Sequence, residues 1–323
     1  MPFSLSDIPF YKENDRPIVF ITGGTSGIGK VTVRELARHG ARVYVTVRNE
    51  AKASALLSEK AEWKNTEEGY EDVVCDIRTI ECDLMDLSSV VRAAHEFQTK
   101  EEKLDILINN AGVLYPEYAE SSDGFETTIQ VNYYAPYLLT YLLLPSLCKA
   151  ATPRVINVSS LAHNLAFGFS FDNPNKKSGW ELMNKGTRYA QSKLAILLFT
   201  KEMAKRHPNI LSVAVHPGVI VDTALYDELQ SSDALFGIVK FSSKMFAQYA
   251  SKMGAISIED GALTSLYCAT DSGLTAELDN GNYYVPIAKL GKCSKQALDA
   301  GLAEKLWVWT EKLLIEKGYI PSL

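Results

Sequence analysis

Short runs of apolar, β-branched residues alternate along this chain with longer amphipathic segments, and no other feature constrains its fold as strongly. The apolar runs predict strands over 17–22, 42–47, 76–81, 104–109, 154–159, 211–216 and 283–285. The amphipathic segments predict helices over 28–39, 51–61, 88–99, 124–149, 187–206 and 260–269. Strands that alternate with helices build βαβ units. We therefore expect an α/β fold, a Rossmann-type doubly wound parallel sheet with helices on both faces.

Three stretches interrupt this alternation. Residues 62–76 are polar and acidic, which predicts a surface loop, and residues 162–186 form a long segment after the strand at 154–159. Loops of this length are usually functional or disordered. A third stretch, about 224–258, is expected to be a helical lid. The sequence predicts an N-terminal extension over 1–16 and a single domain over 17–323, with the lid inserted in it.

Charge, cysteine and histidine usage narrow the classes of function. The chain has 33 Lys and Arg against 39 Asp and Glu, a net charge of −6, and such an acidic balance argues against a nucleic-acid-binding protein. Five cysteines, with no CxxC pair, fit a reducing compartment rather than a disulfide framework. The five histidines lack the spacing of metal ligands, so no metal site is expected. Among them, His163 is expected to be a surface or packing residue.

No apolar stretch predicts membrane insertion. The N-terminal 17 residues lack the apolar core of a signal peptide. The longest apolar run, 135–148, is broken by Pro136 and Pro145 and falls short of the ~20 residues that span a bilayer. We expect a cytoplasmic protein without a transmembrane segment, and membrane-surface association stays open. The apolar residues 137–144 are either core or the interface of a homo-oligomer.

A glycine-rich loop joins the first predicted strand to the first predicted helix. Its sequence is Thr-Gly-Gly-Thr-Ser-Gly-Ile-Gly, with glycines at Gly23, Gly27 and Gly29. Glycines allow a tight turn and let the backbone approach a pyrophosphate closely. The helix that follows offers free N–H groups and a partial positive charge. The loop therefore predicts a dinucleotide site.

This loop resembles the TGxxxGxG motif of the short-chain dehydrogenase/reductase family. Further motifs of that family follow in its order, and the resemblance covers about residues 17 to 269. They are Asp83-Leu84, the NNAG motif at 109–112, Asn132, Ser159-Ser160, the YxxxK motif formed by Tyr189 and Lys193, and Pro217-Gly218 with Thr223. The segments VINVSSLAH and YAQSKLAILLFTKEMAKR are similar to the retinol-dehydrogenase-like branch.

The resemblance implies a catalytic set of Tyr189, Lys193, Ser160 and Asn132. Tyr189 and Lys193 are four residues apart on a predicted helix and therefore share a face. A nearby ammonium and an oxidised nicotinamide both favour the phenolate, so we expect a lowered tyrosine pKa and general acid–base catalysis. In the family the serine holds the substrate oxygen, with Ser159 as the fallback, and the asparagine holds a water that relays protons.

The resemblance also implies the cofactor-binding residues, which are Gly23, Thr25, Ser26, Gly27, Ile28, Gly29, Asp83, Leu84, Asn110, Ala111, Gly112, Tyr189, Lys193, Pro217, Gly218, Ile220 and Thr223. Asn110 either packs against the cofactor or has a purely structural role. The acid that binds the ribose 2′-OH in NAD enzymes is replaced by Val47, which Arg48 follows. An arginine pairs with a 2′-phosphate, so we expect NADP(H), with a solvated surface arginine as the alternative.

These residues predict an NADP(H)-dependent oxidoreductase that interconverts a ketone or aldehyde and an alcohol. In the lid, Leu235, Ile238, Val239, Phe241, Met245, Phe246 and Tyr249 recur at helical spacing. Such side chains favour a bulky hydrophobic substrate, although plain packing or docking to a membrane surface also fits. A non-catalytic NADP-binding regulator on the same fold is the alternative function, and a scaffold role lacks any visible interaction module.

Overall fold

The computed structural model describes residues 2–63, 70, 73–114, 118–171, 181–220 and 255–321. Its centre is an eight-stranded sheet of order β3-β2-β1-β4-β5-β6-β7-β8. The strands are β1 Ile18–Ile21, β2 Arg42–Val47, β3 Asp76–Glu81, β4 Ile106–Asn109, β5 Arg154–Val158, β6 Leu211–Val215, β7 Tyr283–Val285 and β8 Lys289–Leu290. All pairs are parallel except β7 with β8. The expected doubly wound α/β fold is confirmed.

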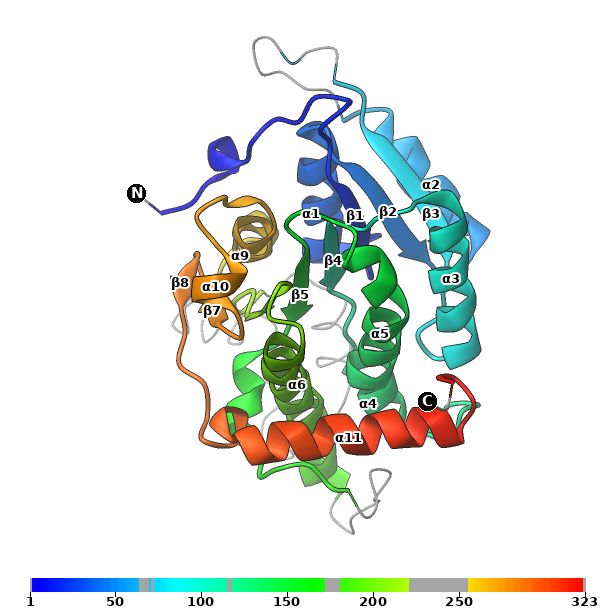
Figure 1. Ribbon diagram of the computed structural model, residues 1–323, viewed down its shortest axis with the longest axis vertical. Coiled ribbons are helices and arrows are strands. Elements are labelled where there is room, and N and C mark those ends of the chain that lie inside the picture. The colour runs from blue at the N-terminus through cyan, green and yellow to red at the C-terminus, as the bar shows by residue number, and fades with distance from the viewer. Residues whose placement is uncertain are drawn as a thin grey trace, which may run out of the picture.

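Helices cover both faces of this sheet (Figure 1). They are α1 Gly27–Arg38, α2 Glu50–Lys60, α3 Leu87–Lys100, α4 Thr127–Ile129, α5 Ala135–Leu147, α6 Glu181–Arg206, α9 Ile258–Thr270, α10 Ala276–Asp279 and α11 Ala300–Glu316. The central strands β1, β4 and β6 are buried along their whole length, as parallel strands covered on both faces must be. Two apolar cores result. One contains residues of α3, α5, α6 and α11, and the other contains residues of α1 and α9.

The helix expected over 124–149 is a composite. Gly124 has a φ of +79° and precedes the helix. The Glu126 carboxylate accepts the Ile129 N–H at 2.9 Å and caps α4. A π-helical segment, Gln130–Tyr134, then joins α4 to α5. Such π-bulges are frequent at functional sites, and this one carries Asn132.

Other boundaries also differ from expectation. The helix expected at 187 begins at Glu181, so the end of the predicted 162–186 loop is helical, and a 3₁₀ helix covers Leu161–Leu165. The lid residues 224–254 lie outside the described residues, and 258 already belongs to α9. Five more elements among the described residues were not predicted: the 3₁₀ helices Leu5–Asp7 and Gln296–Leu298, α10, β8 and α11.

The C-terminal helix α11 crosses α6 (Figure 1). The Trp307 ring stacks on Phe199 of α6 at 5.6 Å and meets Tyr137 of α5 at 5.1 Å. The Tyr133 hydroxyl lies 2.8 Å from the Thr310 hydroxyl. Residues 137, 138, 139 and 143 of α5 are fully buried, so the apolar face of this helix is core.

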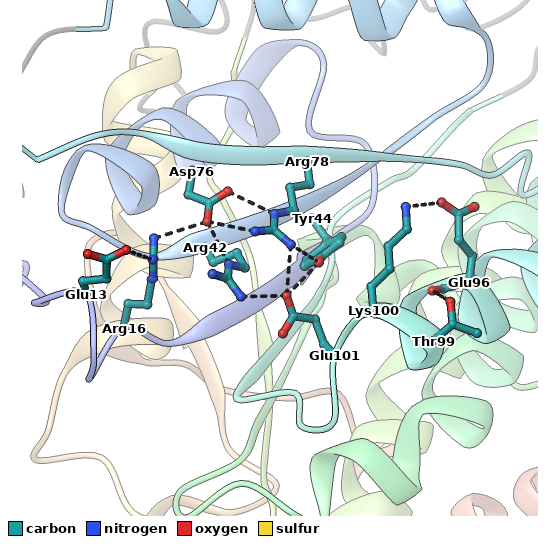
Figure 2. A network of polar contacts seen from close by, with 10 residues as sticks. All are labelled: Glu13, Arg16, Arg42, Tyr44, Asp76, Arg78, Glu96, Thr99, Lys100 and Glu101. Carbon is teal, nitrogen blue, oxygen red and sulfur yellow. Dashed lines mark hydrogen bonds and ion pairs between the residues drawn. The ribbon is translucent and has the colours of Figure 1, made fainter.

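The residues before β1 pack on the domain. Ile8 is buried in the core beside α1, and the Tyr11 N–H bonds the His39 carbonyl at 2.8 Å. Arg16 reaches Asp76 at 3.2 Å. Figure 2 shows this contact as part of a polar network in which Arg42 bridges Asp76 and Glu101. The network ties the chain start to β2, β3 and the end of α3.

Within the described part of the chain, no helix combines the length and the apolar character that a membrane span requires.

Candidate active site

A cavity of about 610 Å³ opens beyond the carboxyl ends of the strands, where doubly wound sheets bind ligands. Its walls include the glycine loop, the ends of β2 to β6 and one face of α6. Among its lining residues are Gly23, Thr25, Ser26, Gly27, Ile28, Gly29, Arg48, Asp83, Leu84, Asn110, Ala111, Gly112, Ser160, Tyr189, Lys193, Pro217, Gly218 and Ile220. All the residues expected to bind cofactor line this one cavity, except Thr223, which lies outside the described residues.

Two glycines of the loop occupy positions that no side chain fits. Gly23 has a φ of +67°, and a Cβ there would lie 2.8 Å from the Ala111 Cα. A Cβ on Gly29 would lie 2.2 Å from the Gly23 carbonyl oxygen and 2.4 Å from the Asn110 Nδ2. Real Cβ contacts are longer than either distance. The glycines therefore let the loop turn tightly against the residues after β4. The loop also lines the cavity at the start of α1, where a pyrophosphate would meet free N–H groups.

Asn110 locks this loop to the end of β4. Its side-chain amide donates to the carbonyls of Thr22, at 2.9 Å, and Gly23, at 3.0 Å. In return, the Thr22 hydroxyl accepts the backbone N–H groups of Asn110 and Ala111, both at 3.1 Å. Of the two roles left open for Asn110, these bonds favour the structural one. Thr22 was not among the expected site residues, although it is the first residue of the TGGTSGIG motif.

Tyr189 and Lys193 lie together on α6 and both line the cavity. The Lys193 Nζ is 5.5 Å from the centre of the Tyr189 ring and donates to the Val158 carbonyl at 2.9 Å. Burial lowers the pKa of Lys193 to about 8. Burial also raises the pKa of Tyr189 to about 12, while a hydrogen bond with Ser160 acts in the opposite direction. In the protein alone, desolvation thus shifts the pKa of Tyr189 upwards. The expected lowering by the ammonium together with an oxidised nicotinamide stays a prediction.

The two serines after β5 have different environments. The Ser159 hydroxyl donates to the Lys193 backbone carbonyl at 2.9 Å and is buried. Ser160 hydrogen-bonds Tyr189, and its Oγ accepts the Ala162 N–H at 3.2 Å. Successive side chains of an extended segment point to opposite sides. Of the two serines, Ser160 therefore shares a hydrogen bond with the tyrosine, and its role in holding the substrate oxygen stays a prediction.

Asn132 lies behind the cavity wall rather than on it. Its side-chain amide donates to the Val113 carbonyl at 2.9 Å and to the Ser192 hydroxyl at 3.0 Å. Its Oδ1 accepts the Val113 N–H at 2.8 Å. Asn132 thus holds the residue after the NNAG turn against α6, and its expected link to a water relay stays a prediction.

Arg48 and Lys52 line the end of the cavity beside the glycine loop. Arg48 directly follows the last residue of β2, and Lys52 is in the first turn of α2, which Asn49 caps. The sequence analysis named Arg48 and missed Lys52. The sequence did offer a signal for Lys52. It lies four residues after Arg48, on the other side of the predicted helix start.

Two histidines border the catalytic residues. His216 lines the cavity, and its buried Nδ1 has no hydrogen-bond partner in the described part of the chain. Burial, with smaller contributions from His163 and Lys193, lowers the pKa of His216 to about 4, so it is neutral at physiological pH. His163 is fully buried, so of its two expected roles the packing role holds and the surface role was wrong.

Known proteins are similar to this chain in sequence and in fold. The family model described as "short chain dehydrogenase" matches residues 17–170. The chain is 36% identical to an uncharacterized oxidoreductase of Schizosaccharomyces pombe, over 97% of this chain and 91% of that protein. It is 38% identical to human retinol dehydrogenase 12, over 90% of this chain and 84% of that protein. The crystal structure of an uncharacterized protein from Mycobacterium paratuberculosis superimposes with a TM-score of 0.70, at 30% identity and 97% coverage of both chains. The chain therefore belongs to the short-chain dehydrogenase/reductase family, in its retinol-dehydrogenase-like branch, and is an oxidoreductase.

Proposed function

We propose that this protein uses NADP(H) to interconvert a ketone or aldehyde and the corresponding alcohol, on a bulky hydrophobic substrate. One observation carries the proposal. The hydroxyls of Ser160 and Tyr189 and the ammonium of Lys193 meet in a single cavity that continues to the bare backbone of the glycine loop. An acid–base pair and a dinucleotide cradle in one cavity are what carbonyl reduction requires.

The cavity residues fit NADP(H). Gly23, Gly27 and Gly29 line the cavity at the start of α1, where free backbone N–H groups suit a pyrophosphate. The cations of Arg48 and Lys52 suit a ribose 2′-phosphate, because a guanidinium pairs with phosphate in a forked geometry and an ammonium adds a point charge. Asp83, Leu84, Ala111, Gly112, Pro217, Gly218 and Ile220 complete the wall, and Thr223 is proposed from its motif. When bound, the cofactor would supply the hydride.

The protein residues then handle the proton and the substrate oxygen. With a pKa of about 12, the Tyr189 hydroxyl is protonated at neutral pH and can donate its proton to a carbonyl oxygen. Ser160, hydrogen-bonded to the same tyrosine, can hold that oxygen in place. Lys193 supplies positive charge in a buried site, where an unscreened charge acts strongly.

The proposed substrate class rests on apolar side chains around this site. Leu161, Val113 and Leu114 line the cavity beyond the catalytic residues. The human relative is named for retinol, a bulky apolar alcohol. The lid residues Phe241 and Phe246 would extend this surface, and they lie outside the described residues.

The test is a screen of lipophilic ketones, aldehydes and alcohols with NADPH or NADP⁺, followed by Tyr189→Phe on the best substrate. We expect turnover to fall by about 10²–10⁴-fold, the usual contribution of general acid–base catalysis, with the Kd for NADPH unchanged. Turnover close to that of the wild type would remove Tyr189 from the mechanism. Tight NADPH binding without turnover of any compound would instead favour the regulatory alternative.

A further inference from the structure

His163 makes two directional hydrogen bonds although it is fully buried. Its Nδ1 lies 2.7 Å from the Ser160 carbonyl oxygen, and its Nε2 lies 3.1 Å from the backbone nitrogen of Ser294. A backbone N–H can only donate and a carbonyl can only accept. The ring must therefore accept at Nε2 and carry its proton on Nδ1. This network allows a single state, the neutral Nδ1–H tautomer, and burial favours it by lowering the pKa of His163.

The hydrogen bond from His163 reaches Ser160 at the point where the backbone hydrogen bonds between β5 and β6 end. β5 ends at Val158, and the last contact of the segment with β6 is the bond from the Ser159 N–H to the Val215 carbonyl at 2.7 Å. Ser160 is thus the first residue beyond the ladder. Its carbonyl accepts both the His163 backbone N–H, at 3.2 Å, and the imidazole Nδ1–H. The 3₁₀ turn and the imidazole take the place of the missing strand contacts.

Residues well after His163 in the sequence contact its imidazole ring. Ser294 follows the β7–β8 hairpin, and Tyr283 of β7 packs edge-on against the imidazole with ring centres 5.3 Å apart. A Cβ on Gly291 would lie 2.6 Å from a Val285 methyl group, so this segment approaches the hairpin closely. The C-terminal segment therefore fixes the tautomer and the plane of the ring.

We propose that His163 is a positioning residue, whose neutral imidazole fixes the Ser160 backbone and so aims the Ser160 hydroxyl at Tyr189, with Ser294 selecting the tautomer. The proposal deepens the proposed function and rests on it, because Ser160 must act on the substrate for its position to matter. Displacing a reacting group by about 1 Å costs roughly 10²-fold in rate. His163 should therefore affect kcat without touching the cofactor.

Three substitutions of His163 distinguish the contribution of its Nδ1 from that of its Nε2. An asparagine amide can occupy the place of Nδ1, so His163→Asn keeps a donor for the Ser160 carbonyl. A glutamine amide reaches the place of Nε2, so His163→Gln keeps the partner of Ser294 and loses that donor. His163→Leu loses both. We expect kcat to fall about 10²-fold in the Leu and Gln variants and to return to within about threefold of the wild type in the Asn variant. KM and the Kd for NADPH should stay unchanged, and rates are normalised to NADPH-binding sites so that unfolded protein does not count.

His39→Leu is the matched control. His39 is also buried, and its Nδ1 also lies 2.7 Å from a backbone carbonyl, that of Glu35, but it ends α1 away from the catalytic residues. It should lower Tm and leave kcat unchanged. If His163→Leu behaves in the same way, or if the Asn variant is as slow as the Gln variant, His163 does not position Ser160. Ser160→Ala in the same assay separates the two proposals. Wild-type turnover in that variant would remove Ser160, and with it His163, from the mechanism, whereas no turnover of any ketone, aldehyde or alcohol by the wild-type protein would refute the proposed function itself.

A second measurement is independent of turnover. In protein labelled with ¹⁵N-histidine, the ring nitrogens of His163, assigned by their loss in His163→Gln, should report a protonated Nδ1 and an unprotonated Nε2 at neutral pH. The Nε2–H tautomer, or a doubly protonated ring, would overturn the proposal.

Discussion

Gly29→Ala tests how the structure builds its cofactor cradle. The new methyl group would lie 2.2 Å from the Gly23 carbonyl oxygen, which is backbone, and 2.4 Å from the Asn110 Nδ2. Overpacking of this kind costs about 1–3 kcal/mol. Relieving it by moving Asn110 breaks the amide bonds to Thr22 and Gly23, at about 1 kcal/mol each. The sum, roughly 3–5 kcal/mol, corresponds to about 150- to 4,000-fold in an equilibrium constant.

This free energy is divided between folding and binding, so both must be measured. We expect a lower Tm by thermal unfolding and a higher Kd for NADPH by fluorescence titration. Gly186→Ala is the matched control, because no described atom outside its own helix lies within 4 Å of a Cβ at this glycine. It should raise stability by about 0.4–1 kcal/mol, since alanine restricts the unfolded chain. A Gly29→Ala protein with unchanged Tm and unchanged Kd would refute the steric reasoning.

Four further outcomes are expected. Arg48→Leu should lower kcat/KM with NADPH about 10- to 150-fold and spare NADH; equal losses in steady-state assays would remove Arg48 from the phosphate site. Arg188→Met leaves the buried Glu126 carboxylate without its cation 3.1 Å away and should cost about 3–5 kcal/mol in urea unfolding; a change below 1 kcal/mol would contradict this. Burial lowers the pKa of Lys193 from 10.5 to about 8, so the unfolded chain binds more protons between these values. The free energy of unfolding, relative to Lys193→Met, should rise across that pH range, and a flat difference would argue against the shift. Phe246→Ala should raise KM for a lipophilic substrate and leave NADPH affinity unchanged, whereas a lower Tm with constant KM would indicate plain packing.

The sequence predicted the parallel sheet well, because a strand that helices cover on both faces consists almost entirely of apolar residues. Val-Phe-Ile of β1 is an example. The start of α6 was missed because Gly186 looks like a helix boundary, although the helix continues through it. The π-helical turn at Asn132 leaves no periodic signal. α11 was missed because it follows the last parallel strand and belongs to no βαβ unit, so no strand pattern indicated where it should begin.

The motifs predicted which residues line the cavity, because the carboxyl ends of parallel strands meet at one edge. They could not predict partners that depend on packing. The bond from His163 to Ser294 joins residues far apart in the chain, and nothing near either position indicates it. Similarly, the direction of the Tyr189 pKa shift depends on how far burial outweighs the hydrogen bond with Ser160, which spacing along a helix does not reveal.

The position of α11 also has a consequence for the order in which the protein is made. α6 carries Tyr189 and Lys193, yet its packing partner α11 follows it only after β6, α9, α10, β7 and β8. At about 5–20 residues per second, the ribosome needs roughly 5–20 s to synthesise the stretch from Arg206 to Ala300. During that interval, Phe199 and Tyr137 lack the Trp307 ring that covers them in the finished fold. Exposed apolar surface of this kind favours aggregation. A nascent chain arrested before α11 should therefore bind chaperones more strongly than the full-length protein.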